Sequence, residues 1–209
     1  MTIIRLTLFL ALLGFLPGTA SSQPATPPAE WIDALRLGGY VIVLRHGPTY
    51  SDQASADSMS RANGPAQRQL NEQGRAQAKS IGEAMRRLKI PVGLVMSSTS
   101  QRAVDTSRLL GLGEVTATPD LGESGPALSA DESERRALAL RKLAATRPLP
   151  DNNLVIVSHK PNIVDAFGED WSAVREGEAS VFEPDGNGGY KLVLRIQASE
   201  WSELVPGPG

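Results

Sequence analysis

The 209-residue sequence contains no cysteine and only two histidines, and aromatic residues make up 5% of it. Without cysteine there can be no disulfide, so the stability of the fold has to come from a hydrophobic core. The formal net charge of −2 gives no reason to expect nucleic acid or an anionic membrane as a partner. Any anion-binding site must therefore be a local concentration of positive charge.

The longest hydrophobic run lies near the start of the chain. Residues 6–16 are apolar apart from Thr7, Arg5 precedes them, and small residues follow up to Ser22. This order is typical of a secretory signal peptide, and the run is shorter than the roughly 20 apolar residues of a membrane-spanning helix. We expect cleavage after Ala20 or Ser22 and export to the periplasm or the medium; an uncleaved membrane anchor is the alternative.

The rest of the chain has the composition of one ordinary globular domain. Hydrophobic residues make up 41% and charged residues 21% of the sequence, and it contains no internal repeat. We therefore divide the chain into a signal peptide (1–22), a Pro-rich leader (23–29) and a single domain (30–209).

Three short apolar runs each lead directly into a polar segment. Residues 40–44 precede Arg45-His46-Gly47, residues 92–96 precede Ser97 to Arg102, and residues 154–157 precede Ser158-His159. Short apolar runs with glycine or polar residues around them are typical of buried strands in a parallel sheet. The carboxyl ends of such strands form the edge at which α/β proteins bind ligands. Both histidines of the chain are therefore expected at that edge.

The segments between these runs have the length and periodicity of helices. Asn71 is a good N-cap for a helix that extends to about Lys89, and a Ser129–Glu132 capping box precedes another helix. Residues 178–183 and 190–196 alternate like the strands of a hairpin. The expected fold is thus a three-layer α/β/α sandwich with a mostly parallel central sheet and a C-terminal antiparallel hairpin.

Two long polar stretches do not fit this periodicity. Residues 46–69 are aperiodic and rich in small polar residues, which is typical of a lid or binding loop. Residues 119–130 form a second loop, which contains Asp120 and Glu123. No cluster of Asp and His residues indicates a metal site, so we expect neither a metal nor another cofactor.

Four blocks in chain order resemble the histidine phosphatase superfamily, also called the phosphoglycerate-mutase-like family. They are Arg45-His46-Gly47, residues 70–78 (LNEQGRAQA), residues 97–103 (SSTSQRA) and Val157-Ser158-His159. The resemblance covers essentially the whole chain after the signal peptide and is to a small, exported, branch-1-type member. It implies the three-layer fold expected above and phosphoryl transfer through a phosphohistidine.

The resemblance also implies roles for individual residues. His46 would be the nucleophile, and Arg45 and Arg102 would bind the non-bridging phosphoryl oxygens through their planar guanidinium groups. His159 would be a further donor to those oxygens, and Arg68 would contact phosphate from the long loop. Nearby guanidinium charge should keep His46 neutral, as a nucleophile requires.

The proton donor for the leaving group is less defined by sequence. Glu123 is the best candidate general acid and Asp120 the second, and some small relatives have no dedicated acid. Lys160 stands where the phytase and acid-phosphatase branch has an Asp, so that branch fits poorly. Glu178 is expected either to orient His159 or an arginine or to be a solvated strand end. Gly47 would let the backbone pass close to the phosphate.

These observations favour an exported, metal-independent phosphatase that hydrolyses a phosphomonoester or a phosphoanhydride. The expected partner is a small phosphorylated substrate or a phosphorylated envelope glycan, with no nucleic acid and no membrane contact after signal cleavage. Two alternatives are a phosphomutase and a non-catalytic module that binds a phosphorylated ligand in the same pocket. The sequence indicates no particular oligomeric state.

Overall fold

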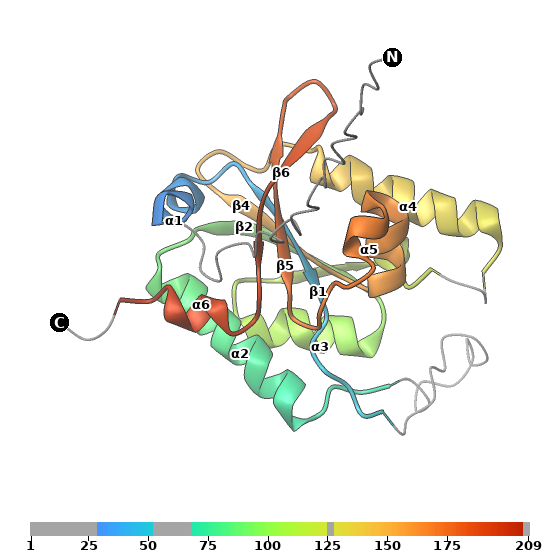
Figure 1. Ribbon diagram of the computed structural model, residues 1–209, viewed down its shortest axis with the longest axis horizontal. Coiled ribbons are helices and arrows are strands. Elements are labelled where there is room, and N and C mark those ends of the chain that lie inside the picture. Colours follow the sequence, from blue (N-terminus) through green and yellow to red (C-terminus); the bar gives the residue numbers. More distant parts are fainter. Residues whose placement is uncertain (1–28, 52–67, 125–127, 207–209) are drawn as a thin grey trace, which may run out of the picture.

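The computed structural model describes residues 29–51, 68–124 and 128–206 (Figure 1). The predicted signal peptide, nearly all of the leader and most of the predicted binding loop lie outside the described residues. No helix in the described ranges is long and apolar enough to cross a membrane.

A six-stranded sheet forms the centre of the domain. Its strands are β1 (Val41–Arg45), β2 (Val92–Ser98), β3 (Val115–Thr118), β4 (Asn153–Ser158), β5 (Ala179–Pro184) and β6 (Tyr190–Ile196). Their order in the sheet is β3-β2-β4-β1-β5-β6. The first four strands of that order are mutually parallel, and β5 and β6 form an antiparallel edge. The predicted fold class is confirmed.

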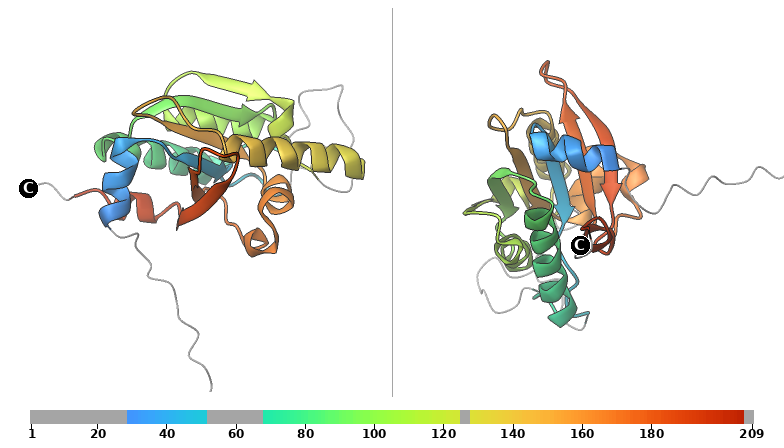
Figure 2. Two further views of the ribbon diagram at one scale, coloured as in Figure 1. Left: turned by 90° about the horizontal axis from the view of Figure 1, so that it is seen from above. Right: turned by 90° about the vertical axis from the view of Figure 1, so that its left-hand side faces the viewer.

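Helices cover both faces of this sheet (Figures 1 and 2). One face carries α1 (Ala29–Leu37), α2 (Glu72–Arg87), α3 (Gln101–Leu110) and α6 (Glu200–Glu203). The other carries α4 (Ala130–Ala144) and α5 (Lys160–Phe167), and the short 3-10 helices η3 (Pro119–Leu121) and η4 (Glu169–Trp171) lie in connections.

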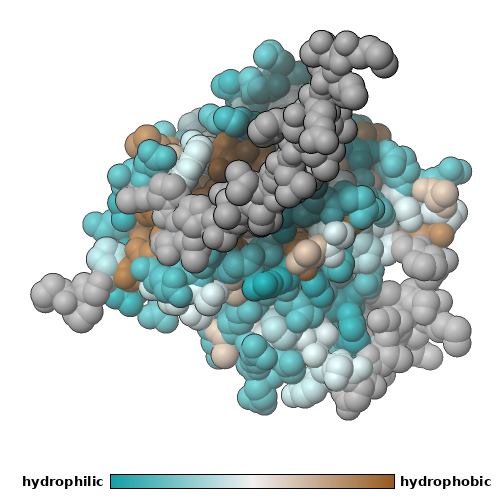
Figure 3. Space-filling view, in the orientation of Figure 1, coloured by the Kyte–Doolittle hydropathy of each residue, from teal (hydrophilic) through white to brown (hydrophobic). Residues whose placement is uncertain are grey.

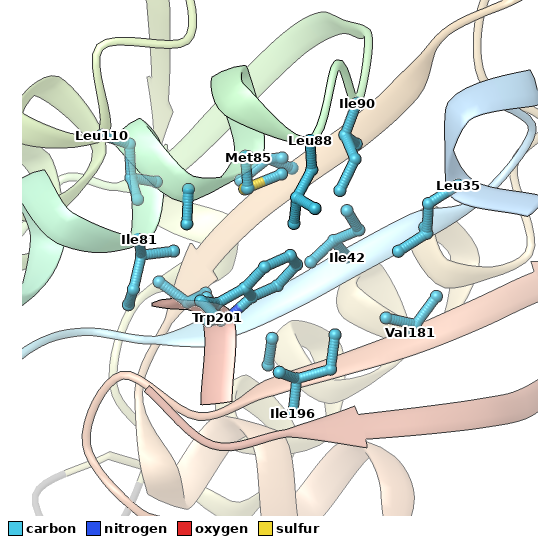
Figure 4. Close-up of a cluster of buried hydrophobic side chains, with 14 of the residues drawn as sticks. Leu35, Ile42, Ile81, Met85, Leu88, Ile90, Leu110, Val181, Ile196 and Trp201 are labelled. Atoms are coloured by element: carbon cyan, nitrogen blue, oxygen red, sulfur yellow. The ribbon is translucent and has the colours of Figure 1, made fainter. Parts of the chain in front are cut away.

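Each face of the sheet has its own hydrophobic core, because successive side chains of a strand point to opposite faces. Ile42 and Leu44 of β1 belong to the cluster under α2, whereas Val41 and Val43 belong to the cluster under α4. Figure 4 shows the ring of Trp201, from α6, packed within the first cluster. The described part of the surface seen in Figure 3 is mainly hydrophilic, with smaller hydrophobic patches.

Both predicted helix caps are confirmed. The Asn71 side chain accepts from Gly74 N at 2.8 Å, and Ser129 Oγ accepts from Glu132 N at 3.2 Å. Ser100 is the N-cap residue of α3 but makes no capping bond with its side chain. Its own N–H instead donates to Ser98 Oγ at 3.1 Å. The hydroxyl that accepts in this turn is thus that of Ser98, at the end of β2, and not that of the N-cap residue Ser100.

A close backbone crossing fixes the chain where it leaves β1. A Cβ atom added to Gly74, in the first turn of α2, would lie 2.2 Å from the carbonyl oxygen of Pro48. A Cβ atom added to Gly47 would lie 3.1 Å from the carbonyl oxygen of Gly74. Because both residues lack a side chain, the segment that follows β1 can lie directly against the start of α2. This crossing gives Gly47 a packing role of its own.

Candidate active site

The topology brings the two histidines together at the carboxyl edge of the sheet. β4 lies between β1 and β2, with Arg45 in register with Ser158. The next residues along the two chains, His46 and His159, therefore leave the sheet side by side. Their ring centroids are 5.1 Å apart. The expectation that both histidines share one edge is met by this geometry.

His46 is held with one ring nitrogen directed into the site. The side chain is buried, and Nδ1 lies 2.8 Å from the carbonyl oxygen of Gly47. A carbonyl oxygen only accepts, so Nδ1 carries the hydrogen and Nε2 keeps a lone pair. That Nε2 accepts from Arg102 Nε at 3.3 Å. A fixed, unprotonated Nε2 is what nucleophilic attack on phosphorus requires.

The surroundings of His46 strongly disfavour its protonated form. Burial and, next, the charge of Arg102 lower the pKa of His46 to about 3. The charges of Arg45 and Arg68 act in the same direction, and only the bond to Gly47 opposes them. The imidazole is therefore neutral at physiological pH.

Arg102 is the buried centre of the site. It lies in the first turn of α3, and 1% of its side chain is exposed. Besides His46, its guanidinium contacts His159 Nδ1 at 3.1 Å and Glu123 Oε2 at 2.5 Å. A buried guanidinium with this carboxylate as a counter-ion is a strong anion site once the carboxylate is replaced.

His159 is arranged differently from what the resemblance implies. Arginine can only donate, so Nδ1 of His159 accepts from Arg102. The hydrogen is then on Nε2, which lies 2.8 Å from Ser98 Oγ. Burial, followed by the neighbouring His46 ring and the charge of Arg102, holds the pKa of His159 well below its ordinary value. In this arrangement His159 orients Arg102, and its N–H is directed at Ser98 instead of at the phosphate position.

Arg45 is partly engaged by the protein itself. Its Nη1 donates to Val174 O at 2.8 Å, and its Nη2 donates to Glu176 at 3.2 Å. Burial lowers the pKa of Arg45, and the Glu176 carboxylate opposes that effect. The terminal nitrogens of Arg45 thus bind the segment before β5. In this structure they are not free to bind phosphoryl oxygens together with Arg102 in the way that the resemblance implies.

The Nε groups of Arg45 and Arg68 are a second source of donors. Both atoms are buried and have no hydrogen-bond partner within the described ranges. The charge of Arg68 lowers the pKa of both His46 and Arg45, which places Arg68 near the site. Buried donors of this kind normally have a partner. An anion beside His46 would supply one.

The structure separates the two candidate acids. Glu123 lies in the site through its ion pair with Arg102. Asp120 instead pairs with Arg135 of α4 at 2.6 Å, with 42% of its side chain exposed. Asp120 is therefore the weaker candidate on geometric grounds.

Glu178 is a buried structural residue. Its carboxylate accepts from Arg195 and, at 2.8 Å, from Gln197 Nε2. The alternative of a solvated strand end is wrong, because the side chain is 1% exposed. The carboxylate does orient an arginine, but that residue is Arg195 on β6. Towards the site, Glu178 contributes its carbonyl oxygen, which accepts from Arg45 N at 3.1 Å, and its negative charge, which acts to raise the pKa of Arg45.

Sequence reasoning missed two site residues, Ser98 and Glu176. Ser98 ends β2, and its place at a strand end among other hydroxyl residues was the available signal. Nothing in the sequence indicates that Glu176 lies beside Arg45. No group of three or more His, Asp or Glu residues that could hold a metal occurs in the part of the chain described.

One family model matches the part of the chain that carries most of these site residues. A model of the histidine phosphatase superfamily (branch 1) matches residues 41–127. That range contains Arg45, His46, Arg102 and Glu123, and ends before His159. No curated protein sequence matches the chain.

Three solved structures with the same fold are named as phosphatases. The protein histidine phosphatase SixA, complexed with tungstate, is 18% identical, with a TM-score of 0.54 over 77% of this chain and 97% of that chain. A putative alpha-ribazole-5'-P phosphatase from Escherichia coli is 19% identical, with a TM-score of 0.55 over 77% and 98%. A mycobacterial glucosyl-3-phosphoglycerate phosphatase complexed with VO3 is 21% identical, with a TM-score of 0.53 over 75% and 98%.

At these identities the structural likeness establishes the shared fold. Residues 41–127 thus match the model of branch 1 of the histidine phosphatase superfamily, and the chain shares its fold with these phosphatase structures.

Proposed function

We propose that the protein is a phosphatase that hydrolyses a phosphomonoester or phosphoanhydride through a phosphohistidine on His46. One observation carries this proposal: the buried, unprotonated Nε2 of His46 faces the guanidinium of Arg102. A neutral nucleophile beside a fixed cation is the pairing that phosphoryl transfer needs, because the transferred group gains charge on its oxygens. The phosphatase names of the structural neighbours support the same activity.

The reaction follows in two displacements. In the first, the lone pair on His46 Nε2 forms a bond to phosphorus, and the bond to the leaving oxygen breaks. Glu123 is the proposed donor of the proton that this oxygen takes up. In the second, water gives a proton to the Glu123 carboxylate and attacks phosphorus, the N–P bond breaks and returns its electron pair to Nε2 of His46, and inorganic phosphate leaves. Arg102 and the Nε donors of Arg45 and Arg68 stabilise the phosphoryl oxygens throughout.

The proposal includes the absence of a metal and a location outside the cytoplasm. Three arginines supply the positive charge that a metal ion supplies in other phosphoryl-transfer sites. The order of residues 1–22 supports export, so a small phosphorylated compound or a phosphorylated envelope glycan is the proposed substrate class. N-terminal sequencing of the protein recovered from the cell envelope tests the export step.

A non-catalytic phosphate-binding module is the second candidate. It is favoured by the position of Glu123, whose carboxylate is bound to Arg102 and has to leave it before it can carry a proton. A phosphatase would hydrolyse a phosphorylated substrate, whereas the binding module would bind it without hydrolysis.

The deciding experiment measures hydrolysis of p-nitrophenyl phosphate by the purified protein in the presence of a chelator. We expect turnover by the wild type and none by His46→Ala. Rapid quenching should trap phosphate on the protein in an acid-labile, base-stable linkage. Equal rates for both proteins would exclude His46 as the nucleophile. Phosphate binding without any turnover would favour the binding module.

A further inference from the structure

The segment that carries Glu123 is anchored before it reaches the site. Leu121, the last residue of η3, is fully buried in the core under α4. Its carbonyl oxygen accepts from Ser158 Oγ at 3.0 Å, which ties η3 to the end of β4. Glu123 lies two residues further on, after Gly122. The bond between Leu121 and Ser158 therefore does not fix the backbone of Glu123.

Arg136 of α4 supplies the next contact of this segment. Its Nη1 donates to the carbonyl oxygen of Glu123 at 2.9 Å, and its Nε donates to Glu132 at 2.9 Å. The side chain is 17% exposed, so it lies mostly beneath the surface. A Cβ atom on Gly122 would lie 2.5 Å from Nη1. The guanidinium therefore packs directly against the backbone beside Glu123.

The charge of Arg136 also acts on His159 in the site. It is among the charges that lower the pKa of His159. Because Arg136 is bound to the main chain of the residue that contacts Arg102, it links α4 to the catalytic groups.

We propose that Arg136 is a positioning residue, which holds the backbone of Glu123 so that its carboxyl group reaches both Arg102 and the leaving oxygen. This inference rests on the proposed function, with Glu123 as general acid. Without Arg136, the carbonyl of Glu123 loses a charged donor and the backbone after Leu121 gains freedom. Misplacement of a catalytic group by even a small distance lowers its contribution to the rate.

Arg135 provides a matched control on the same helix. It shares Glu132 with Arg136 and binds the side chain of Asp120, but with 49% of its own side chain exposed. Its guanidinium donates to the side chains of Glu132 and Asp120 and not to the backbone of Glu123. Loss of Arg135 removes a similar charge and a similar ion pair while leaving the support of Glu123 in place.

The test compares a phosphate ester with a poor, alkyl leaving group and p-nitrophenyl phosphate, whose leaving group needs little protonation. General acids contribute about 10² to 10⁴ in rate. We expect Arg136→Gln to lower kcat for the alkyl ester by about tenfold or more and to change kcat for p-nitrophenyl phosphate by less than about threefold. Arg136→Lys should recover part of the loss, and Arg135→Gln should behave like the wild type.

The double variant tests whether Arg136 acts through Glu123. Glu123→Gln alone should lower kcat for the alkyl ester, and Arg136→Gln added to it should cause no further loss. Additive losses, or equal losses on both esters, would overturn the positioning role. If the wild type hydrolyses neither ester, the proposed function itself fails.

A second variant keeps the test independent of Arg136 itself. Gly122→Ala adds a Cβ that would lie 2.5 Å from Nη1 of Arg136 and 2.9 Å from the carbonyl oxygen of Pro119, so it displaces the guanidinium and also presses on the backbone of η3. We expect the same selective loss on the alkyl ester, with thermal unfolding showing that each variant is folded. An unchanged alkyl-ester rate in folded Gly122→Ala and Arg136→Gln would refute the inference.

Discussion

The carboxylate of Glu123 lies 2.5 Å from Nη2 of Arg102, at the guanidinium that would bind an incoming phosphoryl group. Since Arg102 is 1% exposed, its charge needs a counter-ion when no substrate is bound. Glu123 is that counter-ion, so a phosphate group has to compete with it. The same exchange would free Glu123 to act on the leaving oxygen.

Removal of this competing charge should strengthen anion binding. Glu123→Gln keeps the size of the side chain but leaves Arg102 without its carboxylate. We expect inorganic phosphate to inhibit this variant about tenfold more tightly than the wild type, which corresponds to ~1.4 kcal/mol. Competitive inhibition constants measure the effect. Asp120→Asn, which removes an exposed carboxylate of the same segment, is the control and should change nothing. Weaker inhibition of Glu123→Gln would contradict the competition.

The protonation of His46 should make the fold sensitive to acid. The pKa of His46 is about 3 in the folded protein, whereas the ordinary value is 6.5. Between these values the unfolded chain binds a proton that the folded chain does not, so stability is full above pH 6.5 and falls as the pH decreases towards 3. Urea unfolding between about pH 7 and pH 4 measures this slope.

His46→Asn serves as the comparison, because it removes the titrating group and keeps a polar side chain. We expect this variant to lose less stability over the same pH range, by about 1 kcal/mol or more. His159 and the carboxylates retain their own dependence in both proteins. A slope unchanged by the substitution would show that His46 does not titrate as expected.

The crossing of Gly74 against Pro48 should be intolerant of a side chain. A Cβ at Gly74 would lie 2.2 Å from the carbonyl oxygen of Pro48, so the chain that follows His46 would have to move. We expect Gly74→Ala to lower the free energy of unfolding by about 1–3 kcal/mol and to reduce activity as well. Gln73→Ala, at an exposed neighbouring position of α2, should be neutral. A stable, fully active Gly74→Ala would contradict the close approach.

Much of the fold could be predicted because it depends on local signals. The apolar runs of β1, β2 and β4 are short and continuous, and the caps at Asn71 and Ser129 lie within one helical turn of the groups they bind. Parallel connections then place the strand ends at one edge without further information. For this reason the convergence of His46, Arg102 and His159 followed from residue order alone.

The finer arrangement could not be predicted because it depends on distant partners. Arg45 is held by Val174 and Glu176, which lie far along the sequence, and no spacing rule relates them. The orientation of the His159 ring depends on Ser98 and Arg102 together. Glu178 faces Arg195 because β5 and β6 pair in one particular register. Side-chain packing within the formed fold determines these hydrogen-bond partners.

Because β5 pairs antiparallel with β1, the edge of the sheet at the site holds two kinds of segment: those that leave the parallel strands and the one that leads into β5. Parallel strands bring chain exits to this edge, but β5 enters the sheet here, with Ala179 in register with Leu44. The segment from 168 to 178 therefore borders Arg45 without carrying the nucleophile or His159. This segment can change without moving His46 or His159, provided that the contacts of Val174 and Glu176 with Arg45 are kept. We therefore expect substrate preference to depend on residues 168–178. Exchange of this segment between related proteins should alter which substrates are hydrolysed.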